Sequence, residues 1–136
     1  MSLSTCSSRR YLYVSALAPA MPSAVVDQIL RQSRERNHRL NLSGALLFDG
    51  ERFCQLLEGE CGRTQTLMAR IATDPRHQDM KLLLDSPVTS KRLMTNWLCG
   101  YCDHEAFETV TLAAASDPQH ALQAFMHLLA GSDLST

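Results

Sequence analysis

Residues 37–59 read NHRLNLSGALLFDGERFCQLLEG. Two apolar runs, 45–48 and 53–57, are separated here by Asp49-Gly50, a dipeptide that tolerates the positive φ of a tight hairpin turn. The pattern therefore predicts a β-hairpin at the centre of the fold. Its second strand contains Gln55 among apolar neighbours, and a buried amide must find hydrogen-bond partners or cost about 1–3 kcal/mol. We expect the Gln55 amide either to make structural hydrogen bonds within the fold or to be part of a binding site.

Length and composition indicate one ordinary globular domain. The chain has 136 residues, of which 45% are hydrophobic and 20% charged, so it can bury a real core. A formal net charge of −1 gives no reason to expect nucleic acid or an anionic membrane as a partner. No segment resembles a signal peptide or a membrane span, so we expect a cytoplasmic protein. The odd number of cysteines, 5, favours reduced thiols over a disulfide framework.

Strand and helix patterns extend outward from the hairpin. Residues 1–10 are polar and basic and are expected to form a loose arm. Alternation and helical spacing predict a strand at 11–16, a helix from Ser23 to near Asn37, a helix at 64–73, and strands at 80–85 and 96–101. The order β-α-β-β-α-β-β predicts an α+β, ferredoxin-like sheet with both helices on one face.

The last part of the chain is predicted to be helical. Asp117-Pro118 is a good pair for the first positions of a helix, and Gly131 is a good stop. Between them Leu122, Phe125, Met126 and Leu129 form one apolar stripe. We therefore divide the chain into a sheet-forming domain, 1–103, and a helical extension, 104–136, which covers the open face of the sheet or forms a dimer surface.

Several polar residues have both an ordinary and a functional interpretation. Tyr13 and Gln55 are either ordinary strand residues or neighbours in one site. Asn37 suits a helix C-cap, because asparagine tolerates the left-handed conformation. The arginines of the first helix, at 31, 34, 36 and 39, form a solvated face or a cradle for phosphates. Residues 74–77, Asp-Pro-Arg-His, form a polar loop or bind an anion.

Motifs for catalysis and metal binding are missing from the sequence. Cys99 and Cys102 have C-x-x-C spacing, but no second pair and no helix start follow directly, so we expect no metal site there. There is no phosphate-binding glycine loop, G-x-S-x-G or H-E-x-x-H, and we expect no catalytic residues. The single tryptophan, Trp97, is either a core residue or an aromatic that exchanges electrons with a bound chromophore.

Taken together, these residues resemble the BLUF family, the blue-light sensors that bind flavin. The resemblance runs from Tyr11 to Tyr101 in the same element order. It rests on Tyr13-Val14-Ser15, on Asn37 followed seven residues later by Gly44, on the stretch 53–59, on residues 74–77 and on Trp97.

The resemblance implies a non-covalently held flavin, normally FAD, between the two helices with its ring edge toward the sheet. Tyr13 would donate an electron and a proton to the photoexcited flavin, and Gln55 would rearrange its amide to give the flavin carbonyl a new hydrogen bond and a small red shift. Asn37 would bind the polar edge of the ring, while Ile29 and Ser33 would line it. Residues matching positions near the ribityl and phosphate side are Arg70, Asp74, Arg76 and His77.

Two positions depart from the family pattern. Cys99 stands two residues after Trp97, where the family usually has methionine, so the proposed Trp/Met exchange is not carried over. Arg36 stands where histidine or asparagine is usual, and reaches toward a flavin phosphate or toward solvent. The photoactive residues expected from the resemblance are Tyr13, Gln55, Trp97 and Cys99.

The expected function is therefore that of a blue-light switch and not of an enzyme. Its output would pass to an unknown downstream signalling protein or through an oligomer change, such as a homodimer or larger assembly. One alternative is a flavin- or nucleotide-binding module of the same fold that lacks light signalling. Another is a small acylphosphatase-like enzyme, which the missing anion-cradling glycine loop disfavours.

Overall fold

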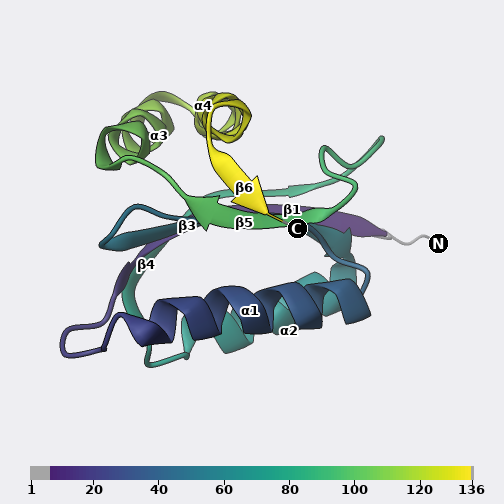
Figure 1. The fold of residues 1–136 in the computed structure, drawn as a ribbon. Helices are drawn as coiled ribbons and strands as arrows, with labels where there is room; N and C mark the ends of the chain where they lie inside the picture. Colours follow the sequence, from purple (N-terminus) through teal and green to yellow (C-terminus); the bar gives the residue numbers. More distant parts are fainter. Residues whose placement is uncertain (1–6, 136) are drawn as a thin grey trace.

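The structure is a computed structural model in which residues 7–135 are described. The expected order β-α-β-β-α-β-β is confirmed, and two further helices and a short strand follow it (Figure 1). The bounds are β1 Ser8–Leu17, α1 Ala24–Arg39, β2 Ser43–Phe48, β3 Arg52–Glu60, α2 Cys61–Ala72, β4 His77–Pro87, β5 Trp97–Tyr101, α3 His104–Ser116, α4 Pro118–Ala130 and β6 Asp133–Ser135.

One mixed sheet with the strand order β4-β1-β3-β2-β5-β6 forms the middle of the molecule. All neighbouring strands are antiparallel except β2 and β5, which are parallel. The hairpin predicted at Asp49-Gly50 joins β2 to β3, with Gly50 at φ +102°. The Asp49 carboxylate accepts hydrogen bonds from the backbone N–H groups of Glu51 and Arg52, and so fixes the turn.

The two faces of the sheet are covered by different pairs of helices. Helices α1 and α2 lie on one face, and α3 and α4 lie on the other (Figure 1). Strand β3 contributes to both sides, because successive side chains of a strand point to opposite faces. Phe53 and Leu57 pack with the residues of α1 and α2, whereas Cys54 and Leu56 pack with those of α3 and α4. The central strands β2 and β3 are thus buried on both faces, as their nearly continuous apolar sequences require.

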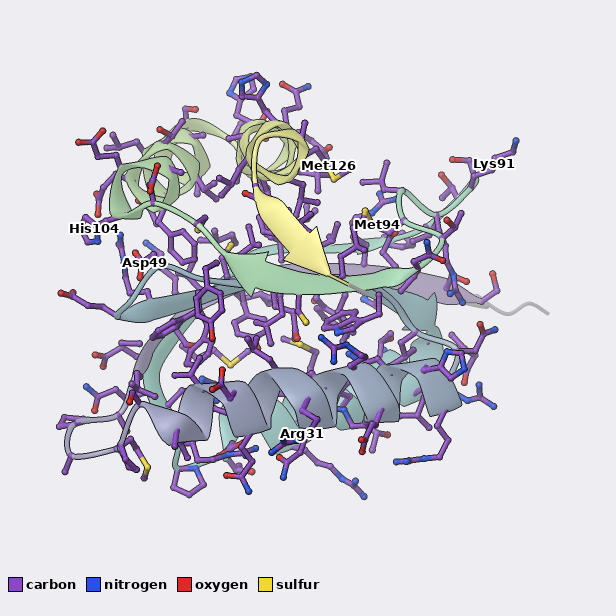
Figure 2. The ribbon with its side chains drawn as sticks, in the orientation of Figure 1. Arg31, Asp49, Lys91, Met94, His104 and Met126 are labelled. Carbon is purple, nitrogen blue, oxygen red and sulfur yellow. The ribbon has the colours of Figure 1, made fainter. Side chains whose placement is uncertain are left out.

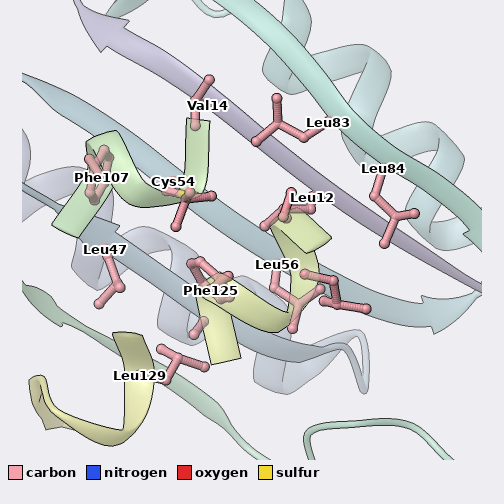
Figure 3. Packing of buried hydrophobic residues seen from close by; sticks show 14 residues of the cluster. Leu12, Val14, Leu47, Cys54, Leu56, Leu83, Leu84, Phe107, Phe125 and Leu129 are labelled. Atoms are coloured by element: carbon pink, nitrogen blue, oxygen red, sulfur yellow. The ribbon is translucent and has the colours of Figure 1, made fainter. Parts of the chain in front are cut away.

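Helices α3 and α4 pack on the sheet through large apolar side chains (Figure 3). The predicted start of α4 is confirmed, since the Asp117 carboxylate accepts from the Gln119 N–H at 3.1 Å and Pro118 occupies the first turn. Its predicted end at Gly131 is confirmed as well. The buried residues that these helices supply are Phe107, Val110, Ala121, Leu122, Phe125 and Leu129.

An ionic cluster joins the start of α3 to the β2–β3 turn. His104 lies beside Asp49 (Figure 2), with 3.2 Å between His104 Nδ1 and Asp49 Oδ2. Arg52 approaches Asp49 at 3.3 Å and Glu108 at 2.9 Å. The guanidinium also lies 5.4 Å from the centre of the Phe107 ring, a cation–π contact. The cluster fixes α3 at the hairpin end of the sheet.

The structure differs from expectation in several places. Strand β1 begins at Ser8, because Arg9 and Arg10 pair with Asp85 and Glu58; residues 1–6 of the predicted arm lie outside the described residues. Helix α1 continues past Asn37 to Arg39, and the left-handed conformation is adopted by Asn41, at φ +56°. Cys61 is disulfide-bonded, which corrects the expectation of reduced thiols for this residue, whereas Cys54, Cys99 and Cys102 remain thiols outside any disulfide.

Candidate functional site

A cleft lies between α1, the sheet and the loop that follows α2. Strands β1, β2 and β3 form its floor, α1 forms one wall, and the end of α2 with the α2–β4 loop forms the other. Most of the polar residues singled out in the sequence meet here, although they are distant along the chain. The lining residues are Tyr13, Ser15, Ile29, Ser33, Arg36, Leu46, Phe53, Gln55, Ile71, Asp74, Arg76 and His77.

Tyr13 and Gln55 form the centre of the floor. They are directly opposite in the antiparallel pairing of β1 and β3. The Gln55 Nε2 group donates a hydrogen bond to the Tyr13 hydroxyl oxygen at 3.1 Å, and the two residues are only 1% and 4% exposed. Burial raises the pKa of Tyr13 well above its ordinary value, so the phenol holds its proton. The floor thus carries a neutral phenol bonded to an amide.

The wall formed by α1 presents alternating apolar and polar groups. Ile29, Ser33 and Arg36 line the cleft at helical spacing. Burial lowers the pKa of Arg36, and the nearby Tyr13 opposes that shift. Arg36 Nε donates to Asn37 Oδ1 at 3.1 Å. Asn37 itself is fully buried, and its Nδ2 group has no hydrogen-bond partner among the described residues.

The second wall is built around Asp74 and Arg76. The Asp74 carboxylate accepts hydrogen bonds from the Arg76 backbone N–H at 2.9 Å and from the Arg76 guanidinium at 2.7 Å. These bonds to Arg76 lower the pKa of Asp74. Arg76 also donates to Gln32 of α1 at 2.8 Å, which connects the two walls. The His77 ring bonds to the Ile71 carbonyl and lies near Tyr13, with 6.4 Å between ring centroids.

Arg70, Trp97 and Cys99 lie outside this cleft. Arg70 lines an adjacent groove between α1 and α2 together with Arg36, Arg39 and Arg63. Trp97 and Cys99 are buried on β5, beyond β2, and they line grooves along the other side of α1. The structure therefore separates these residues from the Tyr13–Gln55 pair, while keeping them on the same face of the sheet.

The sequence reasoning missed several lining residues. Ser15 follows Tyr13 by two positions, and its buried hydroxyl has no partner among the described residues. Phe53 precedes Gln55 by two positions and faces the same side. The two-residue period of a strand was the signal that could have found both. Leu46 carried no such signal, because it lies within a uniformly apolar segment, and Ile71 carried none, because it falls on the ordinary apolar positions of a helix.

The described residues, 7–135, offer neither a helix for a membrane span nor a cluster of side chains for a metal ion. No helix there combines the length and apolarity needed to cross a membrane. No group of three or more His, Cys, Asp or Glu side chains is placed to hold a metal ion in residues 7–135.

Sequence comparison gives matches to light sensors. The profile of the BLUF family, "Sensors of blue-light using FAD", matches residues 9–100. The blue light- and temperature-regulated antirepressor BluF of Escherichia coli (strain K12) is 30% identical over 81 residues, which are 60% of this chain and 20% of that protein. Photoactivated adenylate cyclase subunit beta of Euglena longa is 28% identical over 97 residues, 71% of this chain and 11% of that protein. The chain thus spans 11–20% of the length of these relatives.

Solved structures share the whole fold. The dark-state structure of the BLUF protein BlrB matches with a TM-score of 0.71 and 28% identity, covering 91% of this chain and 96% of that one. The photo-activated state of BlsA matches with a TM-score of 0.75 at 21% identity, covering 95% and 99%, which is a likeness of fold.

Proposed function

Because the chain belongs to the BLUF family of flavin-using blue-light sensors, we propose that it binds FAD in the cleft between α1 and α2 and works as a reversible light switch. The hydrogen bond between Gln55 and Tyr13 on the floor of that cleft carries the proposal. An amide and a phenol buried together at a ligand cleft have two alternative hydrogen-bond arrangements, which is what a switch requires.

The residues of the cleft fit a flavin. Ser15 Oγ is a buried polar atom of the cleft lining without a partner among the described residues, and the carbonyl and nitrogen atoms at a flavin edge would satisfy such a group. Asn37 is not a lining residue, but it directly follows the lining residue Arg36, and its buried Nδ2 also has no partner among the described residues. Ile29, Leu46 and Phe53 supply the apolar contacts that a planar ring needs. Tyr13, Ser33, Gln55 and His77 complete the set of polar contacts.

We assign FAD in place of a mononucleotide because of the charge next to the cleft. Arg36 lines both the cleft and the adjacent groove, where Arg39, Arg63 and Arg70 outnumber the acidic lining residue Glu60. Guanidinium groups bind phosphate oxygens in bidentate fashion, so a row of them suits the two phosphates of a dinucleotide. Arg76, whose guanidinium is oriented by Asp74, would add a contact on the opposite wall.

The chain's own residues divide the chemistry between them. When bound, a flavin absorbs blue light and accepts an electron and a proton in its excited state. Tyr13 supplies both, the proton leaving from Oη, and later takes them back. Gln55 turns its amide, so that Oε1 replaces Nε2 at the Tyr13 hydroxyl and that hydroxyl changes from acceptor to donor. No substrate is consumed, so we propose a sensor that has no enzymatic activity of its own.

The light signal is proposed to reach a partner through the sheet and the helices α3 and α4 that cover its opposite face. A rearranged Gln55 biases another element only if the two states make different contacts with it. Residues 1–103 would form the flavin-binding unit, and residues 104–136, of which α3 and α4 pack on the opposite face of the sheet, would present the changed surface to a partner protein or a second copy.

The proposal is tested by absorption spectra of the purified protein in darkness and directly after blue light. We expect a flavin spectrum that shifts slightly to the red and relaxes in the dark. The variant Gln55→Leu is expected to bind flavin but to show no shift, because leucine has neither donor nor acceptor. A flavin spectrum without any shift in the wild-type protein would point to a silent flavin module, and a protein that takes up no flavin would contradict the proposal.

A further inference from the structure

We propose that Arg34 is a positioning residue for the switch, which acts through Cys99 and speeds the decay of the light-induced state. This inference rests on the proposed function of the Tyr13–Gln55 pair. It assigns a role to an α1 arginine that lies outside the flavin cleft, on the side of the helix that faces β5.

Cys99 stands in one row with the photoactive pair. The register places Tyr13 opposite Gln55, Gln55 opposite Leu46, and Leu46 beside Cys99. Neighbouring strands are about 4.8 Å apart, so two strand spacings, about 10 Å, separate the backbones of Gln55 and Cys99. A cysteine side chain does not reach across this distance. Any effect of Cys99 on Gln55 therefore passes through the packing of Leu46 or through another element.

Arg34 connects Cys99 to helix α1, which is such an element. Its Nη2 group donates to Cys99 Sγ at 3.1 Å. Arg34 follows Ser33, which lines the flavin cleft, and the turn of about 100° between successive helix residues places the two on different sides of α1. Helix α1 thus faces the cleft with Ile29, Ser33 and Arg36 and holds β5 with Arg34.

A second bond fixes the same helix to the same strand. The Tyr101 hydroxyl donates to Asp27 Oδ1 at 2.8 Å, two turns before Arg34 along α1. Asp27 and Tyr101 are closer to solvent than the Arg34–Cys99 contact, in which the cysteine is 1% exposed. The buried contact lies level with Gln55 and the exposed one does not, so we assign the effect on the switch to Arg34 and Cys99.

The contact between Arg34 and Cys99 is expected to affect the rate at which the light-induced state decays. Arg34 stabilises the resting position of β5 against α1, toward which the light-induced state relaxes. Removing that contact destabilises the resting state and, in part, the transition state that leads to it, so the barrier to relaxation rises and the relaxation slows. Loss of one hydrogen bond with a charged donor predicts that Arg34→Met lowers the decay rate about three- to tenfold. The dark absorption maximum is expected to stay unchanged, because Arg34 does not line the cleft.

The experiment measures the dark decay of the red-shifted state in the flavin-loaded full chain. Cys99→Ala should slow decay as Arg34→Met does, and the double variant should be no slower than either single one, since both remove the same contact. Arg34→Lys and Cys99→Ser keep a donor and an acceptor and should recover much of the wild-type rate. Arg31→Met is the control, because Arg31 is an exposed arginine of α1 (Figure 2) that lines the same groove as Arg34, whereas the bond to the Cys99 sulfur comes from Arg34.

Several results would overturn the assignment. A decay rate in Arg34→Met that stays within twofold of wild type, an equal effect of Arg31→Met, or fully additive effects of the two single variants would each exclude it. If Arg34→Met does not fold, the same comparison is made between Cys99→Ala and Cys99→Ser. A wild-type protein that shows no red-shifted state would refute the proposed function and this proposal together, and is recognised before any variant is made.

Discussion

At the scale of single residues, the proposed function depends on the buried hydroxyl of Tyr13. The phenol is buried, keeps its proton, and accepts a hydrogen bond from Gln55 at 3.1 Å. A buried phenol that bonds only to an amide can lose and regain a proton without exchange with solvent. The surrounding residues of the cleft hold this pair in one geometry.

Tyr13→Phe is expected to bind flavin normally and to lose the red shift. The phenyl ring keeps the apolar contacts, but it lacks the oxygen that supplies the proton and accepts from Gln55. The light-minus-dark absorption spectrum measures the outcome. Tyr11→Phe is the matched control, because Tyr11 is also buried and lies on the same face of β1, two residues away. A normal shift in Tyr13→Phe would refute the role of Tyr13.

Asp74 predicts a particular dependence of stability on pH. Its hydrogen bonds with Arg76 hold its pKa below the ordinary value of 3.8. The stabilisation is present above that ordinary value and is lost as the pH falls through the lowered one. Asp74→Asn should therefore lose less stability than wild type between about pH 5 and pH 2. Denaturant unfolding across this range checks it, and parallel curves for the two proteins would contradict the assignment.

At the scale of elements, the sequence was sufficient where a local rule decided the structure. The Asp49-Gly50 turn and the Asp117-Pro118 start of α4 are both present. Long-range pairing decided the rest. Strand β1 extends to Ser8 because Arg10 finds the buried Glu58, and the short strand β6 forms only because β5 offers it a free edge. Asn37, a good C-cap by its chemistry, lies inside α1 because the sheet buries it.

Gly44 should be the least tolerant position of the hairpin. It has φ +139°, and a Cβ atom there would lie 1.9 Å from the Leu56 carbonyl oxygen of the neighbouring strand. Gly44→Ala is expected to cost about 3 kcal/mol of unfolding free energy or more, because backbone must move. Gly50→Ala is the control, since Gly50 also has positive φ but has open space around it, and should cost about 1 kcal/mol. Equal costs, measured by denaturant unfolding, would contradict this explanation.

The site was only partly predictable from the sequence, because long-range strand pairing and not a local rule brings its residues together. Tyr13, Gln55 and the loop residues 74–77 were found because they interrupt apolar or regular patterns. Their meeting in one cleft depends on the order of strands in the sheet, which local patterns do not fix. Cys99 lies in a neighbouring groove because strand β2 stands between β5 and the pair, and Arg70 lines the adjacent groove between α1 and α2.

At the scale of the whole molecule, two cores share one sheet. The core under α3 and α4 contains Phe107 and Phe125, both fully buried, and includes no residue of the flavin cleft (Figure 3). Phe125→Ala should therefore lower the unfolding free energy by about 3–5 kcal/mol and leave the size of the red shift unchanged. Chemical unfolding and the light-minus-dark spectrum of the same sample test the two statements. A reduced shift in a folded, flavin-loaded Phe125→Ala would show that the cores are not independent at rest.

Strand β3 contributes side chains to both sides of the sheet, and this arrangement has a mechanical consequence. Cys54 and Leu56 are embedded in one core while Gln55, between them, faces the cleft on the other side. Close-packed interiors have low compressibility and transmit strain. A sub-ångström displacement of β3 that accommodates a turned Gln55 amide is therefore not absorbed locally. In the proposed switch it would be passed on to Phe107 and Phe125, so that the stiffness of the packing would convert the rotation of one amide into movement of the helical layer of α3 and α4.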